Sequence, residues 1–289
     1  MFNQNIKSPV NIPVSKIYPF EGNPYKVLDN DEMNTLIGSI QEQGILTPII
    51  IRPIESTDEY EVISGHRRLH ATLKAGMKEV PAFIYAVTRD EAAIMLVDSN
   101  LYREHILPSE KAFAYKLKLE AIKRQGERTD LTSDQVGRKL ESAELIANKS
   151  DDSKTQVRRY IRLTNLIPEL LELVDEEKIA LTPAVELSYL SDEEQYSLLG
   201  TIEEEDRTPS LSQAVRFKKL SQAGELSDES IETIMQEDKA NQKPMFKVSM
   251  ERLQKVAPKV KDKDFEDFVL KACEHYYRYL LRQRDRDSR

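Results

Sequence analysis

The sequence has no tryptophan, a single cysteine and only nine glycines among its 289 residues. Because Cys273 stands alone, the chain cannot form an internal disulfide or a cysteine-based zinc site, which fits a reducing compartment. No apolar run approaches the roughly 20 residues that cross a bilayer. Residues 1–9 contain no hydrophobic signal core, which argues against export. These absences predict a cytoplasmic protein without a membrane span.

Several catalytic and metal-binding patterns are also missing. The sequence contains no Gly-X-X-X-X-Gly-Lys-Ser/Thr phosphate loop and no Gly-X-Ser-X-Gly elbow. Two histidines lie four residues apart, but the arginines between them, Arg67 and Arg68, repel a cation and argue against zinc. We therefore expect no conventional kinase, ATPase, hydrolase or metabolic enzyme. The four histidines are His66, His70, His105 and His275.

Charge and helix-favouring residues are abundant. About a third of the chain is charged, and Leu, Ile, Ala, Glu and Lys are common, so we expect a predominantly helical protein. A length of 289 residues favours more than one domain. The net charge of −8 argues against nucleic-acid binding by the chain as a whole, but binding depends on where the charges lie.

Residues 10–87 alternate between short strand and helix patterns. Strands are expected near 12–17, at 48–51, at 60–63 and at 80–87. A helix is expected from Asp29 or Asn30 to Gln43, with Met33 and Ile40 on its apolar stripe, and a second from 66 to 75. This alternation predicts a small α/β or α+β domain.

The segment from Glu61 to Val80 carries the clearest chemistry in this region. A strand turns through Gly65 into a helix, which leaves backbone N–H groups free at the helix start. Arg67 and Arg68 in the first turn suit bidentate phosphate contacts. The pattern indicates a phosphate-binding turn for a nucleotide. The alternative is an ordinary connection with two solvated arginines, and spacing alone leaves both open.

From residue 88 the pattern becomes helical. Helices are expected at 89–101 and 108–124, followed by a polar break at 125–131. Residues 132–165 indicate a helix-turn-helix, with helices at 132–139, 141–147 and 154–165, the last capped by Asp152 or Ser153. The alternative is a solvated helix in a bundle, and we favour DNA binding. The residues expected to face DNA are Ser153, Lys154, Thr155, Gln156, Arg158, Arg159 and Arg162.

The remaining chain changes in character twice. Residues 169–206 are strongly acidic and should face away from DNA, within an all-α region that ends near a joint at 221–228. We expect a linker at 237–244 and a short strand at 245–248. A helix with an apolar stripe from Phe265 to Leu280 must pack against something, either a partner helix in a dimer or the preceding domain. The basic terminus at 282–289 is expected to be a frayed end rather than a DNA contact.

Several motifs occur in an order that resembles the ParB family of chromosome and plasmid partition proteins. They begin at 12–17 and Asn23-Pro24 and continue through 38–52. The segment from 63 to 71, followed by 75–81, looks like the family's Gly-Glu-Arg-Arg box with its downstream Ala-Gly-X-X-X-Val-Pro. Residues 99–104 resemble the Glu-Asn-Ile-Gln-Arg box, and 166–170 match the segment after the recognition helix. The resemblance covers about residues 10–190.

The resemblance implies a fold and a division into domains. The N-terminal domain should be α+β, with a small mixed sheet like that of sulfiredoxins. An all-α helix-turn-helix domain and a mostly helical C-terminal segment should follow. The implied domains are a nucleotide-binding domain at 10–104 and a DNA-binding domain at 105–224. Residues 1–9 are expected to form a flexible tail. Residues 225–289 lie outside the resemblance and are expected to form a helical segment, with dimerisation as a candidate role.

The resemblance also implies a function. Such proteins are dimeric clamps that bind CTP with Mg²⁺ and close around a palindromic, centromere-like site in double-stranded DNA. They serve plasmid or chromosome segregation with a ParA-type ATPase, on the nucleoid or plasmid. Asn100 is the implied Mg²⁺ ligand. The residues implied for nucleotide binding are Ser15, Ile17, Thr47, Gly65, His66, Arg67, Arg68, Asn100, Arg103 and Glu104.

Two departures from the family pattern concern the metal ion. His66 stands where the box has glutamate, and Ser99 replaces the acidic residue before Asn100. A site with fewer carboxylates should bind Mg²⁺ more weakly, unless Asp98 or Glu104 compensates. Whether CTP is hydrolysed is therefore open, and no residue is assigned a catalytic role.

Two other functions compete with the partition clamp. The same scaffold suits a transcriptional regulator or a nucleoid-associated factor. The N-terminal fold also occurs in enzymes, namely sulfiredoxins and some nucleotide-dependent kinases. A sulfiredoxin needs a cysteine directly after the box glycine, where this chain has His66. The kinase needs a catalytic carboxylate near the box, for which the sequence offers no clear candidate.

Overall fold

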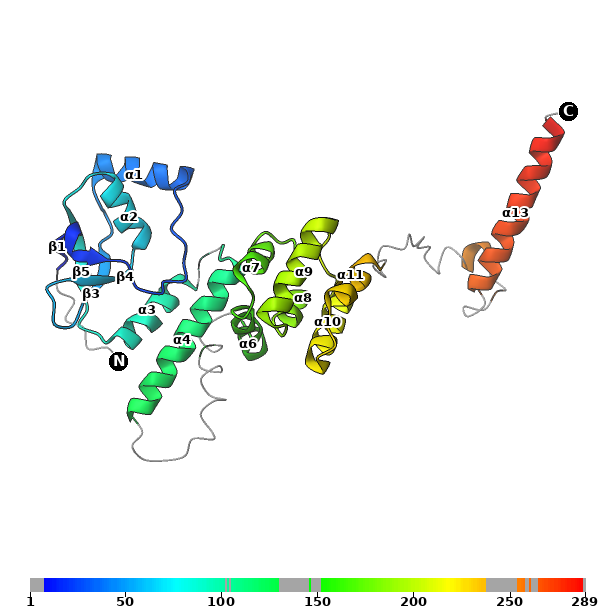
Figure 1. Cartoon of the computed structure of the whole chain (residues 1–289). Helices are drawn as coiled ribbons and strands as arrows, with labels where there is room; N and C mark the ends of the chain where they lie inside the picture. Colours follow the sequence, from blue (N-terminus) through cyan, green and yellow to red (C-terminus); the bar gives the residue numbers. More distant parts are fainter. Residues whose placement is uncertain are drawn as a thin grey trace. The chain divides into compact units, whose positions relative to one another are not determined.

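The computed structural model contains two compact units, residues 1–237 and 238–289, each considered by itself (Figure 1). The structure describes residues 8–101, 103, 105–129, 146, 152–237, 254–257, 260 and 265–287. The expected tail at 1–9, the helices at 132–139 and 141–147, the linker at 237–244 and the strand at 245–248 fall wholly or largely outside these residues. No helix in the described part is long and apolar enough to span a membrane.

A five-stranded mixed sheet forms the first part of unit 1, in the order β1-β5-β3-β4-β2. The β1–β5 and β3–β4 pairs are antiparallel, and the β3–β5 and β2–β4 pairs are parallel. This confirms the expected α+β domain with a small mixed sheet. The strands are β1 (Val10–Pro13), β2 (Ile17–Tyr18), β3 (Ile49–Pro53), β4 (Tyr60–Ser64) and β5 (Glu79–Ile84).

Both faces of the sheet are covered because its central strands are apolar on both sides. Ile49 and Ile51 of β3 share a core with Leu69 of α2 (His66–Lys74). The residue between them, Ile50, packs with Ile63 in the core of α3 (Arg89–Asn100). Successive side chains of a strand point to opposite faces, so one helix packs on each side. α1 (Asp31–Gln43), capped by Asn30 as expected, packs on α2 (Figure 1).

Helices make up the rest of unit 1. A large core joins the apolar faces of the helices from α7 onward and includes Leu170, Leu198 and Phe217. This confirms a predominantly helical chain after the sheet. The helices are α4 (Pro108–Thr129), α6 (Lys154–Leu163), α7 (Pro168–Asp175), α8 (Leu181–Leu187), α9 (Asp192–Glu205), α10 (Leu211–Ala223) and α11 (Asp228–Gln236).

The structure differs from the expected boundaries at two helix ends and at one domain boundary. α4 continues to Thr129 through the predicted break at 125–131, because a single glycine, Gly126, costs an interior turn only about 1 kcal/mol. α6 ends at Leu163 rather than at 165, shortly before Pro168. The expected domain end at 224 is a left-handed turn at Gly224 inside the unit, because Ile234 of α11 is buried in the helical core.

Polar contacts join the sheet region to α4 and α7. The backbone N–H of Lys26 donates to Glu110 of α4 at 2.8 Å. The Ser109 hydroxyl donates to Asp175 of α7 at 2.5 Å, and the Lys26 ammonium lies 3.5 Å from the same carboxylate. The loop that carries Lys26 is therefore bonded to the helices that follow the sheet.

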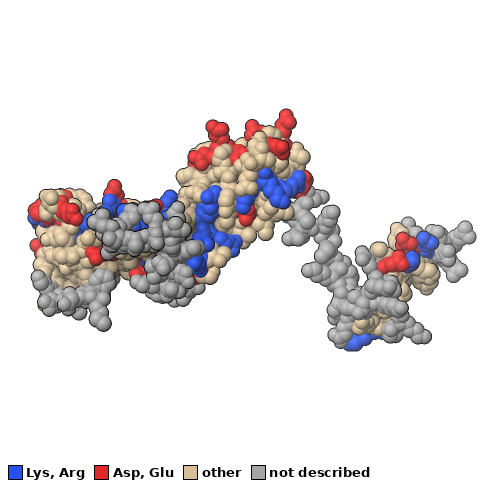
Figure 2. All heavy atoms as spheres, turned by 90° about the horizontal axis from the view of Figure 1, so that it is seen from below, with Lys and Arg blue, Asp and Glu red and all other residues tan. Residues whose placement is uncertain are grey.

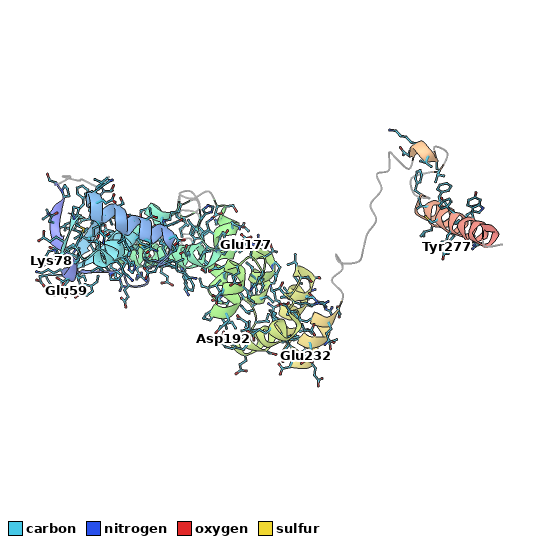
Figure 3. All side chains as sticks on the ribbon, turned by 90° about the horizontal axis from the view of Figure 1, so that it is seen from above. Glu59, Lys78, Glu177, Asp192, Glu232 and Tyr277 are labelled. Atoms are coloured by element: carbon cyan, nitrogen blue, oxygen red, sulfur yellow. The ribbon has the colours of Figure 1, made fainter. Side chains whose placement is uncertain are left out.

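The described part of unit 2 consists mainly of α13 (Phe265–Asp287). The predicted apolar stripe lies on this helix, and Phe265 is buried. Tyr276 and Tyr277 are more than 60% exposed, and Tyr277 is labelled in Figure 3. The aromatic rings of Tyr276 and Tyr279 stack on each other with centroids 6.2 Å apart. Within the described residues, much of the aromatic surface of α13 is open to solvent.

Candidate nucleotide pocket and DNA-facing helix

The turn between β4 and α2 requires glycine. Gly65 has a φ of +103°, a left-handed conformation that L side chains rarely adopt. A Cβ atom there would lie 2.7 Å from Cγ2 of Ile49 and 3.2 Å from Nη2 of Arg68. Glycine thus lets the chain enter α2 tightly against β3, with the first N–H groups of the helix unbonded within it. Such a helix start attracts anions.

A cavity of 580 Å³ opens beside this turn. That volume lies in the range of small-molecule sites. Its walls come from the loop before α1, from α1 itself, from the start of α2 and from the end of α3. The lining residues are Asn23, Tyr25, Lys26, Val27, Glu32, Thr35, Leu36, Ser39, Ser64, Gly65, His66, Arg67, Arg68, Ser99, Asn100 and Arg103.

Three arginines line the cavity, two from α2 and one from the segment after α3. Arg67 lies 3.0 Å from the carboxylate of Glu32 on α1. Arg68 donates to the carbonyl oxygens of Thr47 and Pro48, the latter at 2.8 Å. Arg103 lies over the ring of Tyr25, 5.8 Å from its centroid. Burial lowers the pKa of Arg68, but a guanidinium stays protonated in proteins. The cavity is therefore cationic.

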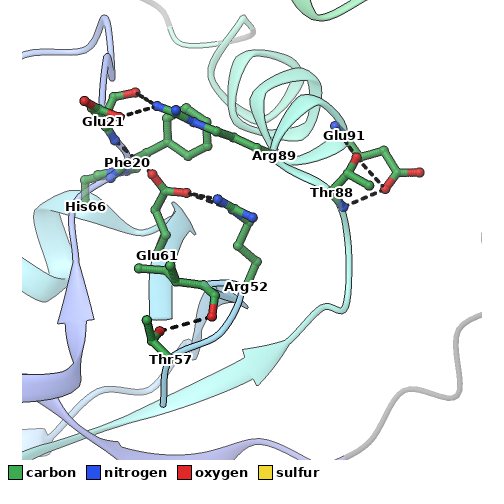
Figure 4. A network of polar contacts seen from close by, with 10 residues as sticks. Phe20, Glu21, Arg52, Thr57, Glu61, His66, Thr88, Arg89 and Glu91 are labelled. Atoms are coloured by element: carbon green, nitrogen blue, oxygen red, sulfur yellow. Dashed lines mark hydrogen bonds and ion pairs between the residues drawn. The ribbon is translucent and has the colours of Figure 1, made fainter. Parts of the chain in front are cut away.

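His66 serves as a hydrogen-bond acceptor toward the protein. Its Nε2 accepts from the backbone N–H of Phe20 at 3.3 Å (Figure 4). Burial, with a smaller contribution from the charge of Arg103, lowers the pKa of His66 to about 4. The ring is thus neutral at pH 7, with the proton on Nδ1. His66 lines the cavity as predicted, and it also holds the Phe20 loop against α2.

A network of ion pairs supports the same loop (Figure 4). Arg52 and Glu61 form an ion pair at 2.7 Å with both side chains about 93% buried. The second oxygen of Glu61 accepts from the backbone N–H of Glu21 at 3.0 Å. Arg89 of α3 lies 2.7 Å from the Glu21 carboxylate. Because a buried charge must be paired, this network fixes the path of residues 20–21.

The Tyr25 hydroxyl has no hydrogen-bond partner within the described residues, although the side chain is only 6% exposed. Burial raises the pKa of this hydroxyl, which therefore stays protonated as a donor. Tyr25 lines the cavity, so a polar ligand atom there would satisfy the hydroxyl. Sequence reasoning missed Tyr25, Lys26 and Glu32, because they lie about 40 residues before the box and carry no motif of their own.

The second predicted box contributes to the pocket in part. Asn100 and Ser99 line the cavity, and both side chains donate to the carbonyl of Leu96 on their own helix. Asp98 forms an ion pair with the fully buried Lys118 of α4 and does not line the cavity. It is therefore unsuited to replace the missing metal-binding carboxylate. Glu104 lies outside the described residues.

Three predicted nucleotide-binding residues do not line this cavity. Ile17 is buried in the sheet core, and Ser15 lies in the short 3-10 turn from Val14 to Lys16. Thr47 takes part only through its carbonyl oxygen, which holds Arg68. The segments that carry these three residues lie in the sheet domain. The direction of each side chain depends on tertiary packing, which the sequence alone does not specify.

α6 has the expected basic surface, with differences among its arginines. Ser153 caps the helix by accepting from the N–H of Gln156. Arg158 is exposed. Arg159 donates to the Thr182 hydroxyl at 2.5 Å. Arg162 donates to the Ser188 carbonyl at 2.8 Å and stacks 3.9 Å from the ring centroid of Tyr189. Arg162 therefore joins α6 to the end of α8, in addition to its position on the predicted surface.

Asp152 anchors the start of α6 instead of capping it. Its carboxylate accepts from the Tyr115 hydroxyl at 2.6 Å and lies 2.7 Å from the Lys111 ammonium, both on α4. Val157 and Leu163 face inward and are fully buried. The helix is thus fixed to α4 at its first turn, and the predicted preceding helix of the helix-turn-helix falls outside the described residues apart from Ile146.

Charge is unevenly distributed over the helical part of unit 1. In Figure 2, Lys and Arg side chains gather on one face and Asp and Glu side chains lie along an edge beside it. Asp192 and Glu232 are at the surface of α9 and α11 (Figure 3). That residues 169–206 face away from DNA stays a prediction.

Comparisons with known proteins identify the family. Residues 3–101 match the family model of the ParB N-terminal domain. The chromosome-partitioning protein Spo0J of Thermus thermophilus is 31% identical over 207 residues, which are 72% of this chain and 70% of that protein. The nucleoid occlusion protein of Listeria innocua is 30% identical over 70% of this chain and 65% of its own length.

Solved structures of ParB from Caulobacter crescentus are similar at a lower level. The C-terminally truncated protein complexed to the centromeric parS site is 20% identical with a TM-score of 0.42, covering 74% of this chain and 99% of that one. Its complex with CTP-gamma-S is 22% identical with a TM-score of 0.32, covering 68% and 99%. The extent and identity of the match to the Thermus protein decide the classification: this chain belongs to the ParB family of partition proteins.

Proposed function

We propose that this protein is a site-specific DNA-binding partition protein whose N-terminal domain binds CTP. The observation that carries the proposal is the convergence of Arg67, Arg68 and Arg103 on one cavity beside the Gly65 turn. A triphosphate needs several cationic donors and free backbone N–H groups, and this cavity offers both. Family membership supports CTP as the nucleotide.

The residues that would hold the nucleotide follow from the cavity. Arg67 and Arg68 flank the start of α2, where the phosphates would meet free N–H groups. Arg103 and the Tyr25 hydroxyl approach from the end of α3 and the loop before α1. We propose nucleotide binding as the activity and assign no residue a catalytic role. Asn100 and Glu104 stay predictions for this site.

Mg²⁺, which the family resemblance implies, does not fit the oxygen donors of the cavity. Mg²⁺ is usually bound through one or two carboxylates together with water and phosphate oxygens. Glu32 is the single acid lining the cavity in the described part of the chain, and it is paired with Arg67. We therefore leave Mg²⁺ out of the proposed binding mode.

DNA is the proposed partner of α6. Exposed Arg158 and half-buried Arg159 lie on a helix whose first turn is fixed to α4, so their side chains start from a rigid base. Side chains near the start of such a helix read base edges, and arginines meet phosphates. A palindromic site and a homodimer belong to the same proposal, with the exposed aromatic stripe of α13 as the dimer contact.

The cellular setting is likewise proposed from the family. We expect a cytoplasmic protein on the nucleoid or on a plasmid, working with a ParA-type ATPase. The second candidate function is a nucleoid-associated factor or regulator, which the similarity to a nucleoid occlusion protein favours. A ParA-like gene beside this one, with inverted repeats nearby, would distinguish segregation from that alternative.

Selection of bound fragments from random DNA, with and without CTP, tests the proposal. We expect one palindromic sequence to be enriched. Arg158→Ala should weaken binding to it and lower the salt dependence by about one unit of slope, as for the loss of one phosphate contact. Arg159→Ala should do the same. Lys178→Ala, at the acidic surface, is the control. No enriched sequence, or wild-type binding by both arginine variants, would contradict the proposed DNA interface.

A further inference from the structure

Among the described residues, the cavity beside α2 is lined by one carboxylate, and that carboxylate is paired with an arginine. The Glu32 carboxylate lies 3.0 Å from Arg67. The side-chain oxygen of Asn23 accepts from the backbone N–H of Tyr25 at 3.2 Å. Ser99 and Asn100 donate to the carbonyl of Leu96, and their side-chain oxygens are neutral, which hard cations prefer less than carboxylates. No cluster of three or more His, Cys, Asp or Glu side chains suited to a metal ion occurs in the described part of the chain.

The charged side chains that line the cavity are mainly cationic. Arg67, Arg68, Arg103 and Lys26 line the same space, against the one carboxylate of Glu32. The Lys26 ammonium is directed partly to Asp175, so the arginines dominate. Their field repels a divalent cation and attracts a polyanion, most strongly where the site is partly buried.

The nearest carboxylate that belongs to the second motif faces elsewhere. Asp98 is paired with Lys118, whose side chain is only 1% exposed. Turning Asp98 toward the cavity would leave a buried ammonium without its partner, which is strongly unfavourable. Asp98 therefore cannot serve as a metal-binding carboxylate in the cavity without a large cost in free energy.

We infer that this cavity binds the free nucleoside triphosphate anion without a divalent metal ion, with the arginines neutralising the phosphates instead. This inference rests on the proposed nucleotide binding. Mg²⁺ complexed to the triphosphate removes two negative charges from the ligand and so weakens its attraction to the arginines. A site that depended on the metal would respond in the opposite direction.

Titration of the full chain with fluorescently labelled CTP, in EDTA and in excess Mg²⁺ at matched ionic strength, tests this. We expect binding in EDTA to be at least as tight as in Mg²⁺. Weaker binding in EDTA would overturn the inference while leaving CTP binding intact. Absence of binding under both conditions would overturn the proposed function as well, so the two failures are distinguishable. Because the full chain contains Glu104, the measured affinities include any metal binding by that residue.

Glu32→Gln separates the two modes of binding further. It removes the one lining carboxylate and releases Arg67, so affinity for CTP in EDTA should rise by roughly fivefold. If Glu32 helped to hold a metal ion, the same change would weaken binding in Mg²⁺, and that result would overturn the inference. Glu42→Gln, an exposed position on the same helix that does not line the cavity, is the matched control and should leave both affinities unchanged.

Discussion

Tyr25→Phe should make the free protein more stable and its nucleotide complex weaker. The substitution keeps the ring, which packs in the core with Phe20 and Ile63, and removes only the buried hydroxyl. That hydroxyl has no partner within the described residues. Leaving such a group unsatisfied costs about 1–3 kcal/mol, so the variant should gain a similar free energy of unfolding without ligand.

The opposite effect is expected once ligand is present. A hydrogen bond from the hydroxyl to a charged phosphate contributes about 1.5–3 kcal/mol. Its loss should weaken CTP binding by roughly tenfold or more. A change of one sign in stability and of the other in affinity is difficult to obtain from a residue that serves packing alone.

Thermal unfolding with and without CTP measures both effects. A domain of this size should shift by about 2–4 °C for each kcal/mol. Tyr18→Phe is the control, because Tyr18 is 44% exposed and donates to Glu59 outside the cavity. Destabilisation of free Tyr25→Phe would show that the hydroxyl has a partner within the protein. Unchanged affinity would show that it does not reach the ligand, and either result would refute the reasoning.

Three further predictions concern other parts of the protein. Gly65→Ala should destabilise unit 1 by about 1–3 kcal/mol, because it adds a left-handed alanine and a clash with Ile49; denaturant midpoints equal to wild type would contradict this. Arg162→Ala should lower stability as well as DNA affinity, because the Arg162 side chain contacts Ser188 and Tyr189 at the end of α8. Arg158→Ala should lower DNA affinity alone. Unfolding curves and DNA titrations of both variants compare the two effects. His66 binds its proton more readily when unfolded, because its folded pKa is about 4 against an ordinary value of 6.5. Stability should therefore fall by up to about 3 kcal/mol as pH drops from about 6.5 to 4, and His66→Asn should reduce this slope in unfolding curves.

Local signals in the sequence were sufficient for most elements of the sheet region. Asn30 caps α1 through its side chain, and Gly65 takes the positive φ that a tight strand-to-helix turn requires. These features depend on residues within one turn of each other, so they can be predicted from neighbouring residues in the sequence. α4 was predicted too short because Gly126 reads as a break, although one glycine inside a helix costs only about 1 kcal/mol.

The residues that line the cavity could be predicted from the sequence only in part. Its motif residues, Gly65 to Arg68 and Asn100, were identified from the sequence and line one cavity. Tyr25 and Glu32 were missed because they reach the cavity only when the loop before α1 folds over α2. Ile17 was included by motif but is buried in the sheet, since its strand position directs the side chain into the core.

The sequence by itself determined the family, the order of the elements and the basic character of α6. Those properties follow from short-range patterns and motifs that are visible in the amino-acid sequence. Only the tertiary structure decided which charges are available. It pairs Asp98 with Lys118, fastens Arg162 to Tyr189 and sets Glu32 against Arg67. Each pair joins residues from separate parts of the fold, and burial and distance determine which charge is neutralised and which stays free for a ligand.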